Sequence, residues 1–287
     1  MGDKMNIIKI VTSNDQTKKY YFSVSNADGP HIEACLLKLP RYGYIICVSS
    51  QIGCAQNCKF CAAHKSGFIR DLTSDEIEEQ VQLIIDDNLY LRETGFQVTY
   101  MGSGEPLSNY KNVFKSIDNI RQKYSKLEKV NVSTTCPTVS AECFNTINWN
   151  KYKDFLHFQY SLHFTEDTER FKYLCPRLLN ISDAINFLNK ISLEINDVYK
   201  INYIPFDNLN DDFESAKNLT AIMSTAQNAV LKISRMCTIL DSTLSPSNSF
   251  ETFIAQVRQL VDNVEVFCSD GTDVNAGCGQ FYNDSIM

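Results

Sequence analysis

The sequence predicts an α/β fold in which a parallel sheet is covered by helices and preceded by a small antiparallel β extension. The first forty residues contain short alternating apolar runs, and from Tyr44 onward strand-length apolar runs alternate with longer amphipathic stretches. The chain has 287 residues and is 44% hydrophobic, which is enough for one large core. Strand and helix alternate about six times, which favours a parallel sheet, either open and doubly wound or closed into a full or partial barrel.

The N-terminal extension is expected to cover residues 1–42. Its apolar runs are separated by the turn-forming stretches SNDQ and NADGP, and they span Asn6 to Val11, Tyr20 to Val24 and Ile32 to Leu39. Alternating runs joined by such turns predict an antiparallel meander. We expect residues 43–287 to form a single catalytic core.

The core is expected to alternate strands with helices. The predicted strands are YIICVSS, FQVTYM, KVNVST, HFQYSLH, YKINYIP, VLKISRM and VEVFC. The predicted helices are Thr73 to Leu91, Tyr110 to Tyr124, Ser182 to Ile191, Phe213 to Ala226 and Ser249 to Val261. Thr73 and Glu76 stand at the spacing of a capping box, which marks the start of the first helix. In such folds the site lies beyond the carboxyl ends of the strands.

Composition and charge limit the classes of function that the chain can have. The formal net charge of −7 should repel polyanions rather than attract them, although a local basic patch is compatible with it. No apolar run approaches the roughly 18 residues that span a bilayer, and the N-terminus lacks a secretory pattern, so we expect a cytoplasmic protein with no membrane partner. Eleven cysteines in such a chain are more consistent with metal ligands or reactive thiols than with disulfides.

Three cysteines form the clearest motif. Cys54, Cys58 and Cys61 have Cys-x3-Cys-x2-Cys spacing and directly follow the first core strand. Close thiolates on a loop are the ligands of iron-sulfur clusters, and three of them leave one iron of a 4Fe-4S cluster open to a small ligand. Zinc is an alternative because His64 would complete a tetrahedron, and a chance cluster of buried thiols is a third interpretation. We favour iron-sulfur, because structural zinc usually has two separated ligand pairs.

The motif, with an aromatic residue before its last cysteine, resembles the radical S-adenosyl-L-methionine (SAM) superfamily. The longer segment CVSSQIGCAQNCKFCAAHKSGFIRDLTSDEI resembles the RlmN/Cfr family of adenine C-methylases. The resemblance continues in order through YMGSGEPLSNYKNV, VSTTCPTVS, QYSLH and NAGCGQ, from about Tyr44 to Gln280. It implies a partial (β/α)6 radical SAM barrel, a 4Fe-4S cluster on Cys54, Cys58 and Cys61, and SAM as the second cofactor.

The resemblance also implies a SAM site. The segment Gly102 to Pro106 matches the family motif that binds the SAM amine, with Gly104 allowing close backbone approach and Glu105 receiving the ammonium. Ser133, Ser161 and His163 end two later strands, where the family contacts the SAM ribose and carboxylate. Taken singly, these features also fit an ordinary Gly-Pro turn and strand-end caps.

Two further cysteines resemble the catalytic pair of the family. Cys278 lies in a glycine-flanked loop, which favours a reactive role for its thiol over a packing role. In the family that it resembles, the matching cysteine carries the methyl group as a thioether. Cys47 matches the second catalytic cysteine, although by pattern alone it is a buried strand residue. The remaining cysteines match no motif and are expected to be structural; they are Cys35, Cys136, Cys143, Cys175, Cys237 and Cys268.

The expected function is C-methylation of an adenine-type amidine carbon, C2 or C8, in a nucleotide or RNA through methyl-Cys278. An electron donor such as flavodoxin or ferredoxin and a substrate-presenting protein are expected partners. The alternatives are a radical SAM reaction of another type on a peptide or metabolite, and a non-enzymatic zinc module.

Two departures from the family concern the substrate. Only 46 residues precede Cys47, so we expect the N-terminal accessory domain of ribosomal RNA members to be missing. Ser234 to Leu240 stands where the family usually has a run resembling Ile-Pro-Trp-Asn.

Overall fold

The computed structural model describes residues 5–24 and 30–282 of the chain. The chain divides into two compact units, and the predicted NADGP turn lies mostly outside the described residues. The first unit comprises Met1–Gln56, Cys61–Val132 and Asp270–Met287; the second comprises Asn57–Phe60 and Ser133–Ser269. These limits differ from the boundary expected after residue 42, which stays a prediction.

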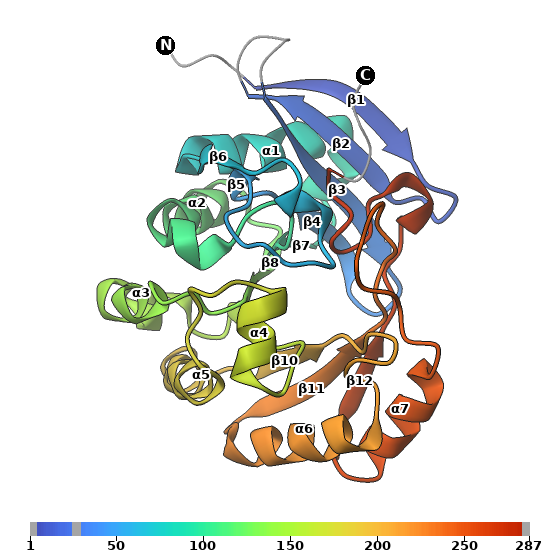
Figure 1. The fold of residues 1–287 in the computed structure, drawn as a ribbon. Helices are drawn as coiled ribbons and strands as arrows, with labels where there is room; N and C mark the ends of the chain where they lie inside the picture. Colours follow the sequence, from blue (N-terminus) through green and yellow to red (C-terminus); the bar gives the residue numbers. More distant parts are fainter. Residues whose placement is uncertain (1–4, 25–29, 283–287) are drawn as a thin grey trace. The chain divides into compact units, whose positions relative to one another are not determined.

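The N-terminal strands of the first unit form the expected antiparallel extension (Figure 1). They are β1 (Asn6–Thr12), β2 (Lys18–Ser23) and β3 (His31–Leu39). Strand β3 also pairs antiparallel with β4 (Gly43–Cys47), and β4 then pairs in parallel with β7 (Phe96–Tyr100), which pairs in parallel with β8 (Leu127–Thr134). Strand β4 is therefore the junction between the extension and the parallel sheet.

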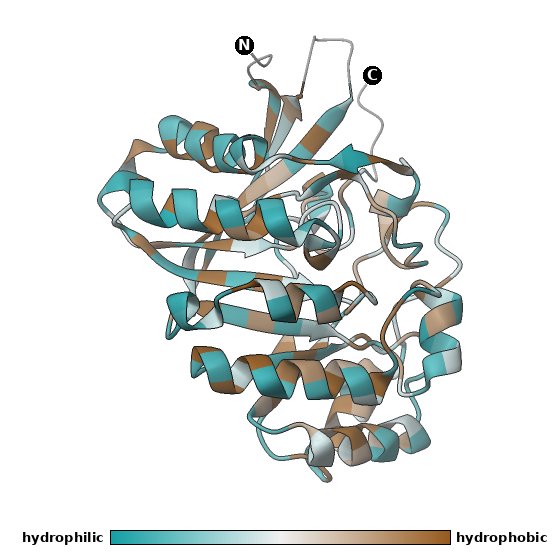
Figure 2. Cartoon of the chain, turned by 90° about the vertical axis from the view of Figure 1, so that its left-hand side faces the viewer, coloured by the Kyte–Doolittle hydropathy of each residue, from teal (hydrophilic) through white to brown (hydrophobic). Residues whose placement is uncertain are grey.

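Two amphipathic helices of the first unit lie side by side in Figure 1, namely α1 (Ser74–Asp87) and α2 (Tyr110–Lys123). Short 3-10 helices accompany them at Leu89–Arg92 and Pro106–Asn109. Helix α1 ends four residues before the predicted Leu91, because Asn88 leaves the helical conformation and its side-chain amide donates to the Ile84 carbonyl at 2.7 Å. Hydrophilic and hydrophobic residues alternate along the helices in Figure 2, which is typical of helices with one buried face.

A short hairpin that the sequence pattern did not reveal carries the cysteine motif. Strand β5 (Gln51–Gly53) pairs antiparallel with β6 (Phe68–Asp71), and the motif lies on the connection between them, which includes a 3-10 helix at Ala62–His64. Gly53 is required at this point, because a Cβ there would lie 1.6 Å from the carbonyl oxygen of Gly67. The hairpin therefore closes the base of the cysteine loop.

The second unit contains a four-stranded parallel arrangement in chain order. Its strands are β9 (Leu156–Ser161), β10 (Tyr199–Tyr203), β11 (Ala229–Ser234) and β12 (Val264–Phe267). The expected helices appear as α5 (Ile181–Ile195), α6 (Phe213–Thr225) and α7 (Phe250–Arg258). Two seven-residue helices were not expected, α3 (Ser140–Thr146) and α4 (Asp167–Tyr173), and a 3-10 helix covers Trp149–Tyr152.

The predicted fold class is confirmed, with parallel strands and an antiparallel N-terminal extension. Within the described ranges, no helix has the length and apolar character needed to cross a membrane.

Candidate active site

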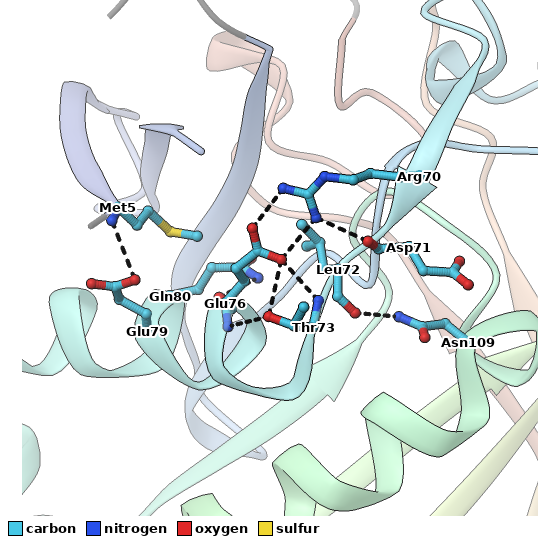
Figure 3. Close-up of polar contacts among 9 residues, drawn as sticks. All are labelled: Met5, Arg70, Asp71, Leu72, Thr73, Glu76, Glu79, Gln80 and Asn109. Carbon is cyan, nitrogen blue, oxygen red and sulfur yellow. Dashed lines mark hydrogen bonds and ion pairs between the residues drawn. The ribbon is translucent and has the colours of Figure 1, made fainter. Parts of the chain in front are cut away.

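The backbone between β4 and the cysteine motif is fixed by two buried amide side chains. The Gln80 amide oxygen accepts from the Ser49 N–H at 2.9 Å, and its Nε2 donates to the Ser49 carbonyl at 3.0 Å. The Asn109 Nδ2 donates to the Ser50 carbonyl at 2.8 Å. It also donates to the Leu72 carbonyl at 2.8 Å (Figure 3). Because these groups are buried, each unmade bond would cost free energy. Helix α1 and the 3-10 helix that precedes α2 therefore hold the chain that leads from Cys47 to Cys54.

The start of α1 anchors β6, the second strand of the hairpin (Figure 3). Arg70 makes a two-pronged ion pair with Glu76, with N···O distances of 2.6 and 2.8 Å. Thr73 and Glu76 form the predicted capping box, which is confirmed. Burial opposes ionisation of Glu76, but hydrogen bonds from Arg70 and Thr73 outweigh it and lower the pKa of this carboxyl. The hairpin is thus tied to a rigid helix end.

Cys54 lies against the Gly-Ser-Gly-Glu-Pro loop within the first unit. The backbone N–H groups of Gln56 and Gly104 donate to its sulfur, and Glu105 is close enough for its charge to act on the thiol. Burial, followed by the neighbouring Cys61 thiol, raises the pKa of Cys54 above its usual value, and burial likewise raises the pKa of Cys61. Buried thiols that stay protonated on their own become ionised ligands when a cation binds beside them.

The cysteine motif has the donor chemistry of an iron-sulfur site. None of the eleven cysteines, all of which lie within the described residues, forms a disulfide, so no motif sulfur is committed to one. Cys58 is buried and belongs to the second unit, and within the described residues no three His, Cys, Asp or Glu side chains already surround a common metal position. His64, the fourth ligand of the zinc alternative, has its Nδ1 against the Cys61 carbonyl oxygen. Three soft sulfur donors with the spacing of the family fit a 4Fe-4S cluster, which would bind them as thiolates.

The Gly-Ser-Gly-Glu-Pro loop packs tightly on the segment before Cys54. Gly104 has a φ of +105°, and a Cβ at this position would lie 2.7 Å from the Gln51 Cβ. The Ser103 hydroxyl donates to the Gly53 carbonyl at 2.9 Å. Glu105 is buried, and one of its carboxylate oxygens accepts from the Leu107 N–H at 3.0 Å. The loop is preorganised by contacts that a larger residue at position 104 would break.

Polar side chains gather at the strand ends of the second unit. The hydroxyls of Ser133 and Ser161 lie 3.4 Å apart, and the Gln159 Nε2 donates to the Ser133 hydroxyl at 3.3 Å. Lys232 donates to the Gln159 amide oxygen at 3.0 Å. Gln159 and Lys232 were not predicted as site residues. The alternation of side chains along a strand could have identified Gln159, because it lies two residues before Ser161 on β9 and therefore faces the same side of the sheet.

His163 is buried just after β9 in a left-handed conformation, with φ of +57°. Its ring meets that of Phe60 edge to face at 4.8 Å, and its Nδ1 has no hydrogen-bond partner among the residues that the structure describes. Burial and then the charge of Arg170 lower the pKa of His163 to about 3. The imidazole is therefore neutral at physiological pH and keeps one ring nitrogen available for a ligand.

Cys47 and Cys35 are direct cross-strand neighbours in β4 and β3. They share a hydrogen bond, and both pack against Ala276 and Phe281 of the C-terminal loop. The Cys35 thiol also donates to the Ala276 carbonyl at 4.0 Å, and Cys278 is near enough for its charge to act on Cys35. Three thiols are thus gathered in the first unit: the two predicted catalytic cysteines and Cys35, which was expected to be structural.

The loop that carries Cys278 is attached on both sides. The Ala62 N–H, directly after Cys61, donates to the Gly279 carbonyl at 2.7 Å. Asp273 accepts from the Ser13 hydroxyl at 2.5 Å, which ties the loop to the turn between β1 and β2. The N-terminal extension therefore supports the predicted catalytic loop, and Gly279 brings it beside the cysteine motif.

A buried ion pair lies beneath the same loop. Lys19 and Glu33 are both fully buried, with an N···O distance of 2.9 Å. Glu33 also accepts from the Tyr282 N–H at 3.0 Å, and the Lys19 ammonium lies 5.7 Å from the centre of the Phe281 ring. Charged residues of this kind are almost never buried unless paired, so the pair marks a site of high local constraint.

Comparison with solved structures establishes the class of fold. No family model matches the chain. A radical SAM methyltransferase from Sphaerobacter thermophilus superposes with a TM-score of 0.86 at 23% identity, covering 98% of this chain and 82% of the other. A spore photoproduct lyase matches with a TM-score of 0.57 at 10% identity, over 82% of this chain and 79% of the other. The fold is that of radical SAM enzymes, as predicted.

Sequence relatives define the family. The chain is 30% identical over 302 residues to the dual-specificity RNA methyltransferase RlmN of Sulfurimonas denitrificans, covering 96% of this chain and 81% of the relative. It is 31% identical over 284 residues to the probable RlmN of Pseudothermotoga lettingae, covering 96% and 78%. The chain belongs to the RlmN family of radical SAM methyltransferases. The predicted family and enzyme class are confirmed.

Proposed function

We propose that this methyltransferase adds a methyl group to C2 or C8 of an adenine-type base in RNA or a nucleotide, with Cys278 as the methyl carrier. The observation that carries the proposal is the packing of the Cys278 loop on Cys47 and Cys35. An exposed thiol on a loop can meet SAM and substrate, whereas Cys47 stays shielded beside it.

The cofactors of the family have matching residues in this chain. Cys54, Cys58 and Cys61 would hold the 4Fe-4S cluster, and Gly104, Glu105, Ser133, Ser161 and His163 would contact SAM. When bound, the cluster and SAM supply the methyl group and the radical that takes hydrogen from it. The unpartnered Nδ1 of His163 and the hydroxyls of Ser133 and Ser161 supply the hydrogen bonds that a polar ligand needs.

Cys278 and Cys47 have different roles in the proposed reaction. Cys278 carries the methyl group as a thioether, so that the substrate carbon becomes linked to its sulfur through a methylene carbon. The surplus electron of the adduct would pass to the bound cluster, and Cys47 takes the proton from the substrate carbon. The Cys47 sulfur then bonds to the Cys278 sulfur as the bond from Cys278 to the methylene carbon breaks, and this carbon takes a proton to become the methyl group of the released base. A thiol beside a sulfur centre is positioned for this exchange, and the disulfide must be reduced before the next cycle.

The substrate class is drawn from the relatives, which are named as RNA methyltransferases. A net charge of −7 gives no general attraction for a polyanion, so RNA contacts would depend on local basic groups. A flavodoxin or ferredoxin is proposed as the electron donor.

The first test is peptide mapping of the methyl group. Enzyme purified and reconstituted without oxygen is incubated with methyl-labelled SAM, and the expected label lies on Cys278 and is lost in Cys278→Ala. Cys268→Ala is the matched control, because Cys268 is also exposed and lies on the same tryptic peptide. Cleavage of SAM without label on Cys278 would refute the carrier role.

The second test concerns Cys47. Cys47→Ala should accumulate a covalent link between Cys278 and an adenine-containing RNA, because the thiol that resolves the adduct is gone. Normal turnover by this variant would exclude the proposed role of Cys47. Parallel reactions with RNA and with free adenosine nucleotides identify the substrate class.

A further inference from the structure

Cys35 has the placement of a reactive residue, although no motif includes it. It lies directly opposite Cys47 in the β3–β4 pair. Directly opposed residues in antiparallel strands have Cα atoms about 4.5–5.5 Å apart, within the range of about 4.4–6.8 Å that a disulfide accepts. The two thiols already share a hydrogen bond. The backbone therefore permits a Cys35–Cys47 disulfide without rearrangement of the sheet.

We propose that Cys35 is a third exchange thiol of the active site, which attacks the Cys47 sulfur of the Cys47–Cys278 disulfide and returns Cys278 as a free thiol. This inference rests on the proposed function, which supplies that disulfide. The Cys35–Cys47 bond forms as the Cys47–Cys278 bond breaks, and the proton lost by Cys35 passes to the leaving Cys278 thiolate. Neither an oxidant nor a reductant is consumed, because one disulfide replaces another.

The surroundings of Cys35 favour this attack once Cys47 is oxidised. In the reduced protein the hydrogen bond to Cys47, followed by burial, raises the pKa of Cys35 well above its usual value. The hydrogen bond is lost when the Cys47 sulfur enters a disulfide. The ammonium of Lys19 lowers the pKa of Cys35 and is held in place by its buried pair with Glu33. Formation of the Cys47–Cys278 disulfide thus removes the largest obstacle to ionising Cys35.

Because of this exchange, the Cys278 thiol is regenerated before an external reductant reduces the disulfide. Cys35 is 1% exposed and Cys47 is 7% exposed, whereas Cys278 is exposed, so the disulfide moves from an accessible sulfur to a buried pair. Cys278 can then accept the next methyl group before any reductant acts. The next adduct can be resolved only after the Cys35–Cys47 disulfide is reduced, because its resolution needs the Cys47 thiol. Scarcity of reductant would therefore hold the enzyme in a methylated, resting form.

The test reads the disulfide pattern after one turnover. Reconstituted enzyme completes a single turnover with RNA and two equivalents of SAM in the absence of added thiol, so that no SAM remains to methylate Cys278 again. Free cysteines are then alkylated at acid pH. Trypsin places Cys35 and Cys47 on separate peptides, and fragment-ion sequencing distinguishes Cys47 from Cys54 and Cys58 on its peptide. The expected wild-type pattern is a Cys35–Cys47 link with alkylated Cys278.

Two substitutions separate exchange from packing. In Cys35→Ser and Cys35→Ala the link should shift to Cys47–Cys278, and alkylation of Cys278 should fall by about tenfold, equivalent to about 30 mV in the two-electron couple. Cys268→Ser should retain the wild-type pattern. Equal urea midpoints for wild type and at least one Cys35 variant show that the fold is retained.

Each failure has its own signature. A Cys47–Cys278 link that persists in the wild type, with the same pattern in the Cys35 variants, overturns the exchange while leaving the proposed function intact. If no methyl group appears on Cys278, the proposed function fails. The same reconstituted enzyme is then oxidised with one equivalent of diamide, and absence of a Cys35–Cys47 link would overturn the role of Cys35 as well.

Discussion

Replacement of Lys19 by Met should loosen the loop that carries Cys278. Lys19 and Glu33 are both fully buried at 2.9 Å, and the variant leaves the Glu33 carboxylate in the interior without its ammonium partner. Breaking a buried pair from one side typically costs about 3–5 kcal/mol in the free energy of unfolding. At about 2–4 °C per kcal/mol for a domain of comparable size, the midpoint of thermal unfolding should fall by roughly 6–20 °C.

The assay combines urea unfolding with the rate at which iodoacetamide alkylates Cys278. The double variant Lys19→Met with Glu33→Gln should recover most of the loss, because neither side chain is then charged and the amide oxygen still accepts from the Tyr282 N–H. Lys217→Met is the control, since the Lys217–Glu214 pair is exposed and should contribute at most about 1 kcal/mol. A Lys19→Met protein within about 1 kcal/mol of wild type would refute the reasoning.

Three further predictions follow from the other contacts of the site. Gln80→Ala removes both hydrogen bonds to the Ser49 backbone and should cost about 1–3 kcal/mol in urea unfolding; an unchanged midpoint would argue against this support. Gly104→Ala places a Cβ 2.7 Å from that of Gln51 at a φ of +105°, so calorimetry should show weaker SAM binding, and wild-type affinity would contradict the predicted contact. The buried imidazole of His163 has a pKa of about 3, below the unfolded value of about 6.5, so between these values the unfolded state binds the extra proton and stability falls as pH falls. Between pH 7 and pH 5 the free energy of unfolding of the wild type should fall by about 2 kcal/mol because of His163. His163→Leu should lack this contribution, and an equal pH dependence of unfolding in the two proteins would contradict the prediction.

Long elements of the fold were predictable because their periodicity is repeated over many residues. The strands and helices of at least five residues with regular apolar spacing were found near their observed limits, and the capping box located the start of α1. The hairpin of β5 and β6 was missed because each strand has only three or four residues and the motif interrupts the pattern. Helices α3 and α4, with seven residues each, are too short to repeat an apolar face.

The candidate site residues could be predicted from sequence motifs, whereas the residues that contact and stabilise them could be identified only in the structure. Cys35 was expected to be structural because it matches no motif. Its pairing with Cys47 depends on the register of β3 and β4, which one sequence does not fix. Gln80 resembles any polar residue on a helix, and only its burial reveals that it serves the Ser49 backbone. Lys19 likewise reads as an exposed strand residue until Glu33 is placed beside it.

The hydrogen bond between Ser13 and Asp273 has a consequence for the order of folding, because it joins residues 260 positions apart in the chain. A contact of such high sequence separation closes only after the intervening segments are compact, since the loop-closure entropy has to be overcome first. The strand pair that buries Cys35 and Cys47 is local and can form much earlier. Cys278 would then arrive at a strand pair that is already assembled, which limits non-native disulfides while the protein folds.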